Sequence, residues 1–153
     1  MQIEVKSPPI RTWRLPSGEP ALALHVDGPL FACAFAASRG VPLLSQSVLL
    51  RGVNDDPAVL GALLRALVEC RVKPYYLHHA DLAPGTARFR TGIAEGQALM
   101  RALRGHYSGL CQPTYVLDLP GGHGKSPVGP SYLDERTGRV RDYTGVAHAY
   151  AGE

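Results

Sequence analysis

Cysteine is scarce in this sequence, and its placement excludes the simplest metal sites. The three cysteines, Cys33, Cys70 and Cys111, form neither a CxxC pair nor a closely spaced triplet. Such spacing offers no local site for zinc or for an iron–sulfur cluster, and the odd number argues against a disulfide framework. We therefore expect three reduced structural thiols and no metal site.

Long runs of like charge and long hydrophobic runs are also missing. The formal net charge is only +3, and no five or six like charges follow one another, so nucleic acid is not an expected partner. The longest apolar stretch, GPLFACAFAAS at residues 28–38, is too short to span a bilayer, and it carries no signal-type cleavage pattern. The expectation is a cytoplasmic protein that does not bind membranes.

What is present favours one folded α/β domain over residues 1–153. The length suits a single domain, and 45% hydrophobic residues are enough for a core. Apolar strand-like segments alternate with helical patterns at βα spacing, which predicts a mostly parallel sheet with right-handed crossovers. The expected strands are 21–26, 41–50, 72–80 and 113–120, with helices over 28–40, after Pro57 and over 91–103, and a carboxyl-terminal β-hairpin around 137–138.

For two of the expected helices, the sequence predicts both the capping residue and the side chains that face inward. Asp55 or Asp56 is placed to cap the helix that begins near Pro57, and Thr91 is placed to cap the later one. The spacing of apolar residues predicts which side chains face inward. They are Val59, Leu60, Leu63, Leu64, Leu67 and Val68 in the first helix, and Ile93, Met100 and Leu103 in the second.

The stretch VLDLPGGHGKSP, residues 116–127, raises the question of a phosphate-binding loop. A P-loop requires a glycine where Leu119 stands, and Pro127 and Pro130 oppose the helix that must follow it. The P-loop interpretation is therefore rejected. Lys125 instead lies on a loop with little side-chain bulk, where its amine can form a Schiff base with an aldehyde cofactor. The alternative is a solvated surface lysine in a flexible turn.

Longer segments resemble a known family. The stretches QSVLLRGVNDDP, KPYYLHHADLAPGTARFRT, IAEGQALMRALRGHYSGLCQPTYVLDLPGGHGK and SPVGPSYL together resemble the carboxyl-terminal half of lysine 2,3-aminomutase. That family consists of radical S-adenosylmethionine, pyridoxal-phosphate isomerases that interconvert L-lysine and β-lysine. The resemblance implies a partial (β/α) barrel over residues 39–153, whereas residues 1–38 match poorly.

The resemblance also assigns roles to individual residues. Lys125 would hold pyridoxal phosphate, on a loop formed by Gly121, Gly122 and Gly124. Asp81 and Asp118 would bind the side-chain ammonium of substrate lysine, in agreement with the strength of charge-assisted hydrogen bonds. The local alternatives are that Asp81 caps its loop and that Asp118 pairs with an arginine. His25 and Gln46 would lie near the S-adenosylmethionine site.

One departure from the family bears on activity. The CxxxCxxC loop that holds the family's [4Fe–4S] cluster is absent from the sequence. Three hypotheses follow: one part of a split aminomutase whose partner chain supplies that loop, a non-catalytic module that binds lysine or a lysine-bearing protein, or an inactive fragment. A homo-oligomer is a further possibility. The adjacent His78 and His79 should point to opposite faces of a strand, so they cannot chelate one metal together.

Overall fold

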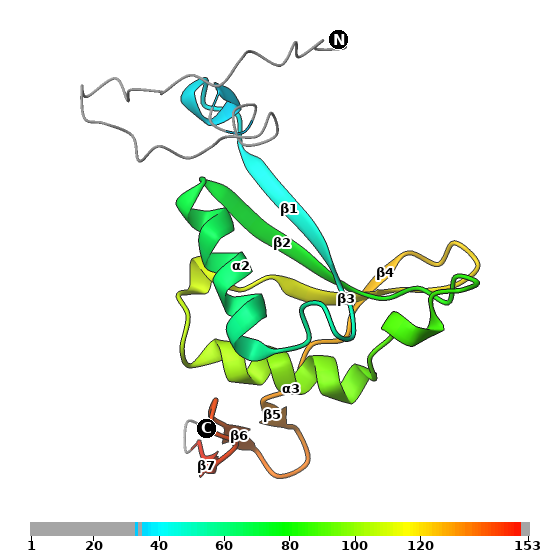
Figure 1. The fold of residues 1–153 in the computed structure, drawn as a ribbon. Coiled ribbons are helices and arrows are strands. Elements are labelled where there is room, and N and C mark those ends of the chain that lie inside the picture. Colours follow the sequence, from blue (N-terminus) through cyan, green and yellow to red (C-terminus); the bar gives the residue numbers. More distant parts are fainter. Residues whose placement is uncertain (1–32, 34, 151–153) are drawn as a thin grey trace.

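The computed structural model describes residue 33 and residues 35–150 (Figure 1). His25 and the expected strand over 21–26 lie outside the described residues. The main sheet has the strand order β1-β2-β3-β4. Its strands are β1 (Leu43–Leu49), β2 (Val72–His79), β3 (Thr114–Asp118) and β4 (Lys125–Pro127).

The sheet confirms the predicted α/β class and corrects one of its strands. β1, β2 and β3 are parallel, as expected from the alternation of strands and helices. β4 runs antiparallel to β3, with Asp118 opposite Lys125. Lys125 is thus not part of a free loop but the first residue of a strand. The sheet is open, so the described chain forms part of a barrel rather than a closed one.

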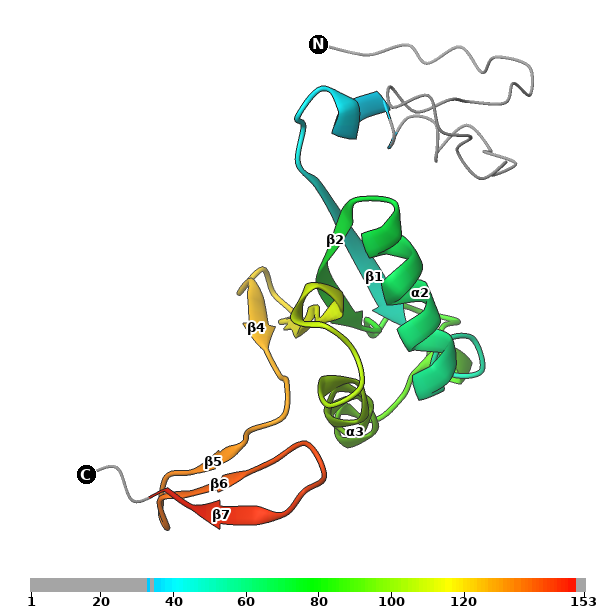
Figure 2. The same ribbon diagram turned by 90° about the vertical axis from the view of Figure 1, so that its left-hand side faces the viewer.

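Two helices cover one face of this sheet (Figure 2). They are α2 (Pro57–Glu69) and α3 (Ile93–Arg104), accompanied by the single turns η1 (Ala87–Phe89) and η2 (Gly109–Cys111). The core between helices and sheet joins Leu49, Leu77 and Tyr115 from the strands to Leu60, Leu64, Leu99, Met100 and Leu103 from the helices. The opposite face of the sheet has no helix against it in the described chain.

The residue that caps the amino-terminal end of α2 agrees with the prediction, and the residue that caps α3 differs from it. Asp56 caps α2, accepting hydrogen bonds from the amides of Ala58 and Val59 at 2.8 and 3.1 Å. Thr91 does not cap α3: the capping residue is Gly92, whose amide donates to the Glu95 carboxylate. The prediction of Thr91 is wrong by one position: Thr91 directly precedes the cap and is buried, only 6% exposed.

Fewer residues of each helix are buried than the apolar pattern in the sequence predicts. Leu60 and Leu64 are buried, but Val59 and Leu63 are 50% and 38% exposed. Gly61 lies between the two buried leucines, and a side chain there would overlap the Tyr107 ring. The close approach of Tyr107 to Gly61 makes the side of the helix that carries Leu60, Gly61 and Leu64 the one that packs against the rest of the protein.

The same effect is seen at the start of α3. Ile93 is 39% exposed, contrary to its predicted inward position, whereas Met100 and Leu103 are buried as predicted. Ile93 is the first residue of the helix, beyond the part that crosses the sheet.

An irregularity in β2 decides which of its residues face the helices. The pairing of β1 with β2 advances from Ser45–Pro74 to Gln46–Tyr76, so Tyr75 is an extra residue in β2. One extra residue in a strand reverses the side-chain alternation beyond it. Val72 and Pro74 face the core before the bulge, and Leu77 and His79 face it afterwards. His78 is therefore turned to the helix-free face.

A small separate sheet follows. The predicted hairpin is confirmed as β5 (Leu133–Asp134) and β6 (Arg139–Arg141), to which β7 (Ala147–Ala149) adds a third antiparallel strand (Figure 2). The Tyr143 ring anchors this sheet to the end of α3, edge-on to His106 at 5.9 Å. Within the described residues, no helix has the length and apolar character needed to cross a membrane.

Candidate functional site

The candidate site lies on the helix-free face, where the parallel strands end. One polar side chain from each strand of the main sheet contributes to it: Gln46 from β1, His78 from β2, Asp118 from β3 and Lys125 from β4. In parallel α/β sheets the carboxyl ends of the strands are where ligands bind, because the loops that follow them meet there. His78, Asp118 and Lys125 therefore stand where a sheet of this type binds its ligands, and Gln46 approaches them from the middle of β1.

These four side chains form one hydrogen-bonded row across the sheet. Gln46 Oε1 lies 3.0 Å from His78 Nε2, and His78 Nδ1 lies 3.0 Å from Asp118 Oδ2. The other carboxylate oxygen of Asp118 accepts a hydrogen bond from Lys125 Nζ at 2.6 Å. The row thus joins residues far apart in the sequence, and we call it the Gln46–Lys125 row.

Asp118 is held as a carboxylate by its neighbours. The hydrogen bond from the Lys125 ammonium lowers the pKa of Asp118 below its usual 3.8, and the hydrogen bond from His78 lowers it further, against the opposing effect of partial burial. Asp118 therefore pairs with a lysine and a histidine, and not with an arginine as the local alternative supposed. Both oxygens of Asp118 are therefore engaged in the structure, Oδ1 by Lys125 and Oδ2 by His78.

The glycine loop between β3 and β4 closes a tight hairpin. The Leu119 amide donates to the Gly124 carbonyl at 2.9 Å, and Gly121, Gly122 and Gly124 all have positive φ, between 78° and 88°. Other residues are strained in this region of backbone conformation, which explains why glycines stand here. A Cβ on Gly122 or Gly124 would meet nothing within 4 Å. The backbone is therefore open at these two glycines, and Gly124 immediately precedes Lys125.

This geometry fits an aldehyde cofactor at Lys125. Its side chain is 41% exposed, so the amine can be reached, and the adjoining loop presents backbone rather than bulk. A phosphate group is commonly bound by backbone amides in such glycine-rich turns. The residues present are therefore suited to pyridoxal phosphate, as the sequence resemblance implies.

Asp81 lies just beyond the end of β2, next to the row but outside it. Its side chain is exposed, and its backbone carbonyl accepts a hydrogen bond from Arg90 Nη2 at 3.0 Å. Because β2 and β3 are parallel neighbours, Asp118, the last residue of β3, and Asp81, two residues beyond β2, lie at the same edge of the sheet. No hydrogen bond within residues 35–150 joins the Asp81 carboxylate to the row. The structure thus places the two aspartates at one edge of the sheet without a direct contact.

His78 is the member of the row that the sequence did not indicate, since it was considered only as a metal ligand. The signal lay in the alternation of side chains: Gln46 and Val48 on β1 share a face with Tyr76 and His78 on β2 once the bulge at Tyr75 is counted. The local signal for that bulge is Pro74, because a proline inside a strand that is paired on both sides is typical of a bulge.

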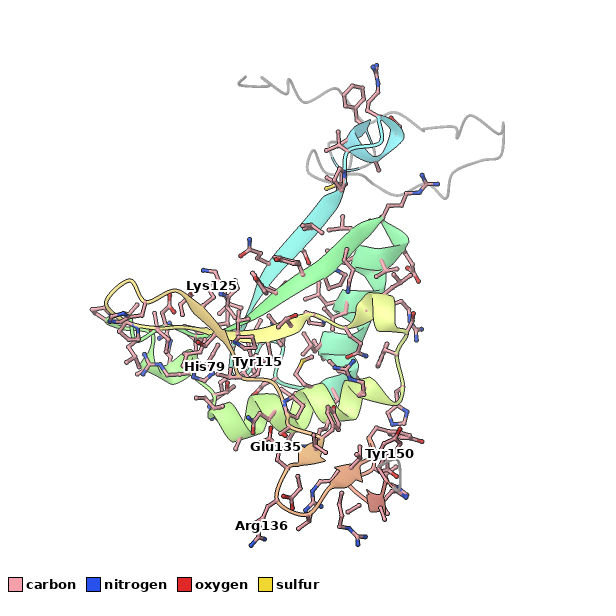
Figure 3. All side chains as sticks on the ribbon, turned by 180° about the vertical axis from the view of Figure 1, so that it is seen from behind. His79, Tyr115, Lys125, Glu135, Arg136 and Tyr150 are labelled. Atoms are coloured by element: carbon pink, nitrogen blue, oxygen red, sulfur yellow. The ribbon has the colours of Figure 1, made fainter. Side chains whose placement is uncertain are left out.

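The other histidine of the pair belongs to the core. His79 Nδ1 lies 2.7 Å from the Tyr115 hydroxyl on the side of the sheet that faces α3, opposite to Lys125 (Figure 3). Burial lowers the pKa of His79 below 6.5 and raises the pKa of Tyr115 to about 12. The prediction that His78 and His79 face opposite sides is confirmed.

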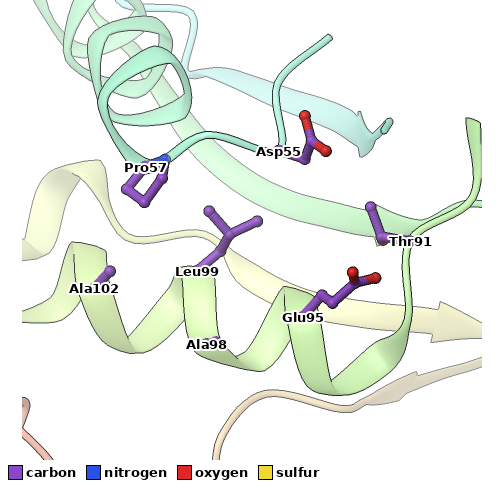
Figure 4. Close-up of a pocket in the computed structure, with 7 residues that line it drawn as sticks. All are labelled: Asp55, Pro57, Thr91, Glu95, Ala98, Leu99 and Ala102. Atoms are coloured by element: carbon purple, nitrogen blue, oxygen red, sulfur yellow. The ribbon is translucent and has the colours of Figure 1, made fainter. Parts of the chain in front are cut away.

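No metal cluster is apparent in the part of the chain that the structure describes. In that part, no three His, Cys, Asp or Glu side chains gather closely enough to hold a metal ion. A hollow of about 420 Å³ lies between the amino-terminal ends of α2 and α3 (Figure 4). Its carboxylates are already engaged, Asp55 with the Gly52 amide and Glu95 with Arg51, both at 2.8 Å.

Comparisons with known proteins agree with the sequence resemblance. A family model described as lysine-2,3-aminomutase matches residues 100–152. The L-lysine 2,3-aminomutase of Clostridium subterminale is 46% identical over 123 residues, which are 78% of this chain and 30% of that protein. A putative L-lysine 2,3-aminomutase of Aquifex aeolicus is 52% identical over 115 residues, 73% of this chain and 31% of that protein.

A third relative acts, by its name, on a different amino acid. The glutamate 2,3-aminomutase of Clostridioides difficile is 44% identical over 102 residues, which are 67% of this chain and 24% of that protein. The chain spans about 30% of the length of the L-lysine 2,3-aminomutases named above.

Proposed function

Because this chain is homologous to the carboxyl-terminal region of lysine 2,3-aminomutases, we propose that it provides the cofactor lysine and the substrate-ammonium carboxylates of a 2,3-aminomutase. The observation that supports this most is the ion pair between Lys125 and Asp118, 2.6 Å long, beside an open glycine loop. It brings together a reactive amine and a carboxylate that the resemblance assigns to cofactor and substrate.

Lys125 and Asp118 would act in succession. Without a cofactor, the carboxylate holds the lysine ammonium. Were the Lys125 amine engaged by pyridoxal phosphate, Asp118 Oδ1 would lose this partner and would be able to accept another ammonium. The side chain of a substrate lysine supplies such a group. The same carboxylate thus serves Lys125 first and the substrate afterwards.

Pyridoxal phosphate, when bound, supplies a conjugated ring that can carry an amino group during its migration. The glycine loop leaves room for that ring next to Lys125. The three cysteines of the sequence do not fit an iron–sulfur cluster, so residues outside these 153, or a partner chain, would supply the CxxxCxxC loop and the radical chemistry.

The charge of the site favours lysine over glutamate as the substrate. Asp118 is ionised and reachable, and Asp81 follows the neighbouring strand at the same edge. Two carboxylates attract a terminal ammonium and repel a terminal carboxylate. We therefore expect the cofactor-loaded chain to bind L-lysine and to discriminate against L-glutamate. Calorimetric titration with both amino acids measures this, and equal affinity would contradict the assignment.

Binding of pyridoxal phosphate tests the proposal directly. The sequence has only three lysines, Lys6, Lys73 and Lys125, which makes assignment simple. The purified chain should give a yellow absorbance band with one cofactor per chain, and Lys125→Ala should abolish it. Lys73→Arg is the matched control, because Lys73 lies near the opposite end of β2 from His78 and its Nζ contacts the carbonyls of Leu110 and Gln112. No band, or one unchanged in Lys125→Ala, would overturn the proposal.

A further inference from the structure

The centre of the Gln46–Lys125 row is a histidine with no assigned role. The His78 side chain is only 13% exposed, and both of its ring nitrogens contact a neighbour, Nε2 with Gln46 and Nδ1 with Asp118. It is the one member of the row that touches Asp118 from the side opposite Lys125. Its position allows it to govern the orientation of that carboxylate.

The two neighbours together determine where the ring carries a proton. An ionised carboxylate only accepts hydrogen bonds, so a hydrogen bond to Asp118 Oδ2 requires a proton on His78 Nδ1. With Gln46 Oε1 against Nε2, as in the structure, Nε2 also carries a proton and the ring is charged. In the neutral ring Nε2 is bare, and the Gln46 amide must turn over so that its NH2 group donates to Nε2. The proton on Nδ1 is therefore needed in both the neutral and the charged ring. The contact of Gln46 with His78 Nε2 holds the ring in its orientation from the other side.

The groups around His78 are few. From β1 it meets the neutral amide of Gln46, and from its own strand the edge of the Tyr76 ring at 5.8 Å between centroids. From β3 it meets the carboxylate of Asp118, and from β4 the ammonium of Lys125 acts through that carboxylate. The hydrogen bond to Asp118 is thus its one contact with a charged group within the described residues.

We propose that His78 is a positioning residue that holds Asp118 Oδ2 through Nδ1–H, so that Asp118 keeps its orientation after Lys125 leaves Oδ1 to bind the cofactor. Gln46 fixes the ring from its other side. This inference rests on the proposed function for its use, since the freed Oδ1 is the atom that would receive the substrate ammonium. The hydrogen-bonded row itself exists without the cofactor.

The protonation of His78 can be read directly. In a long-range ¹H–¹⁵N correlation spectrum of the cofactor-free chain, each histidine ring shows which nitrogen carries the proton. The sequence has six histidines, and the signals of His78 are identified by their loss in His78→Phe. We expect a protonated Nδ1 at a pH where the ring is neutral, unlike free imidazole side chains, in which the Nε2–H form predominates. A neutral His78 ring with a bare Nδ1 would overturn the proposal.

Three variants test whether His78 acts on Asp118. His78→Phe keeps a ring but removes both hydrogen bonds, so the carboxyl titration of Asp118, followed by ¹³C shifts, should move to higher pH. His78→Asn offers an amide donor near the position of Nδ1 and should restore much of the original midpoint. His148→Phe, in the small carboxyl-terminal sheet, should leave it unchanged. An unchanged midpoint in His78→Phe would show that His78 does not hold the carboxylate.

The consequence for the substrate is measured separately. With pyridoxal phosphate bound, His78→Phe should weaken L-lysine binding roughly tenfold, as expected for the loss of one hydrogen bond to a charged group, and leave cofactor binding intact. The affinity of His78→Asn for L-lysine should lie between that of the parent protein and that of His78→Phe. If Lys125 fails to bind the cofactor, the proposed function fails while the result on the Nδ1 proton still stands. If Lys125 binds it and Nδ1 is bare, only the role of His78 is lost.

Discussion

Replacement of Gly96 by alanine tests the packing that supports the site from below. Gly96 lies in α3 directly against Tyr115, and a Cβ at this position would overlap the Tyr115 hydroxyl and ring. Tyr115 is 1% exposed and its hydroxyl contacts His79 at 2.7 Å, so the ring has little freedom to withdraw. The substitution therefore forces a shift of either α3 or the strand that carries Asp118.

The size of the effect follows from opposing contributions. Alanine favours the helix by about 1 kcal/mol over glycine. Overpacking costs about 1–3 kcal/mol, and loss of the Tyr115–His79 hydrogen bond costs about 0.5–1.5 kcal/mol. We expect Gly96→Ala to lower the free energy of unfolding by about 1–3 kcal/mol, seen as a lower urea midpoint at unchanged slope.

Two controls separate the clash from helix propensity. Ala98→Gly, at an exposed position of the same helix, should cost about 1 kcal/mol by propensity alone. Adding Tyr115→Phe to Gly96→Ala removes the hydroxyl that the new methyl would meet, and should recover part of the loss. A Gly96→Ala protein at least as stable as the parent would refute the packing described here.

Three further predictions concern the core, the pH dependence and the loop. Leu77→Ala, at a fully buried position of β2, should cost about 2–5 kcal/mol in urea unfolding, and a cost below 1 kcal/mol would contradict its burial. Burial lowers the pKa of His79, so as the pH falls below 6.5 the unfolded chain binds a proton before the folded chain does, and the free energy of unfolding should decline down to the folded-state pKa. His79→Gln should remove this decline. An unchanged pH profile in that variant would contradict the prediction. Gly124→Ala, at a φ of 86°, should weaken pyridoxal-phosphate binding without abolishing folding, as measured by absorbance titration and circular dichroism, whereas full binding would show that the glycine is dispensable.

Much of the fold follows from local patterns in the sequence. The apolar run over 41–50, the capping Asp56 and the apolar stripe after Pro57 predict β1 and α2, and the alternation of elements predicts a parallel sheet. The ranges 72–80 and 113–120 likewise match β2 and β3 to within a few residues. Each of these depends on interactions close along the chain.

The parts that were missed depend on long-range pairing. β4 has only three residues and contains Pro127, so only its pairing with β3 makes it a strand. The bulge at Tyr75 decides that His78 faces the site; Pro74 beside it favours a bulge, but whether β2 is paired on both sides depends on the long-range pairing. The resemblance to the aminomutases indicated Lys125, Asp118 and Gln46 separately, whereas only the register of the four strands shows that His78 joins them.

Chemical trapping of the cofactor tests the central claim most directly. The chain is incubated with pyridoxal phosphate, reduced with borohydride and digested, and the labelled lysine is identified by mass spectrometry. The sequence has three lysines, Lys6, Lys73 and Lys125. We expect the label at Lys125 in the parent protein, and in Lys125→Ala we expect neither remaining lysine to be labelled to the extent that Lys125 is in the parent. Label shared evenly among the three lysines, or absent from Lys125, would contradict it.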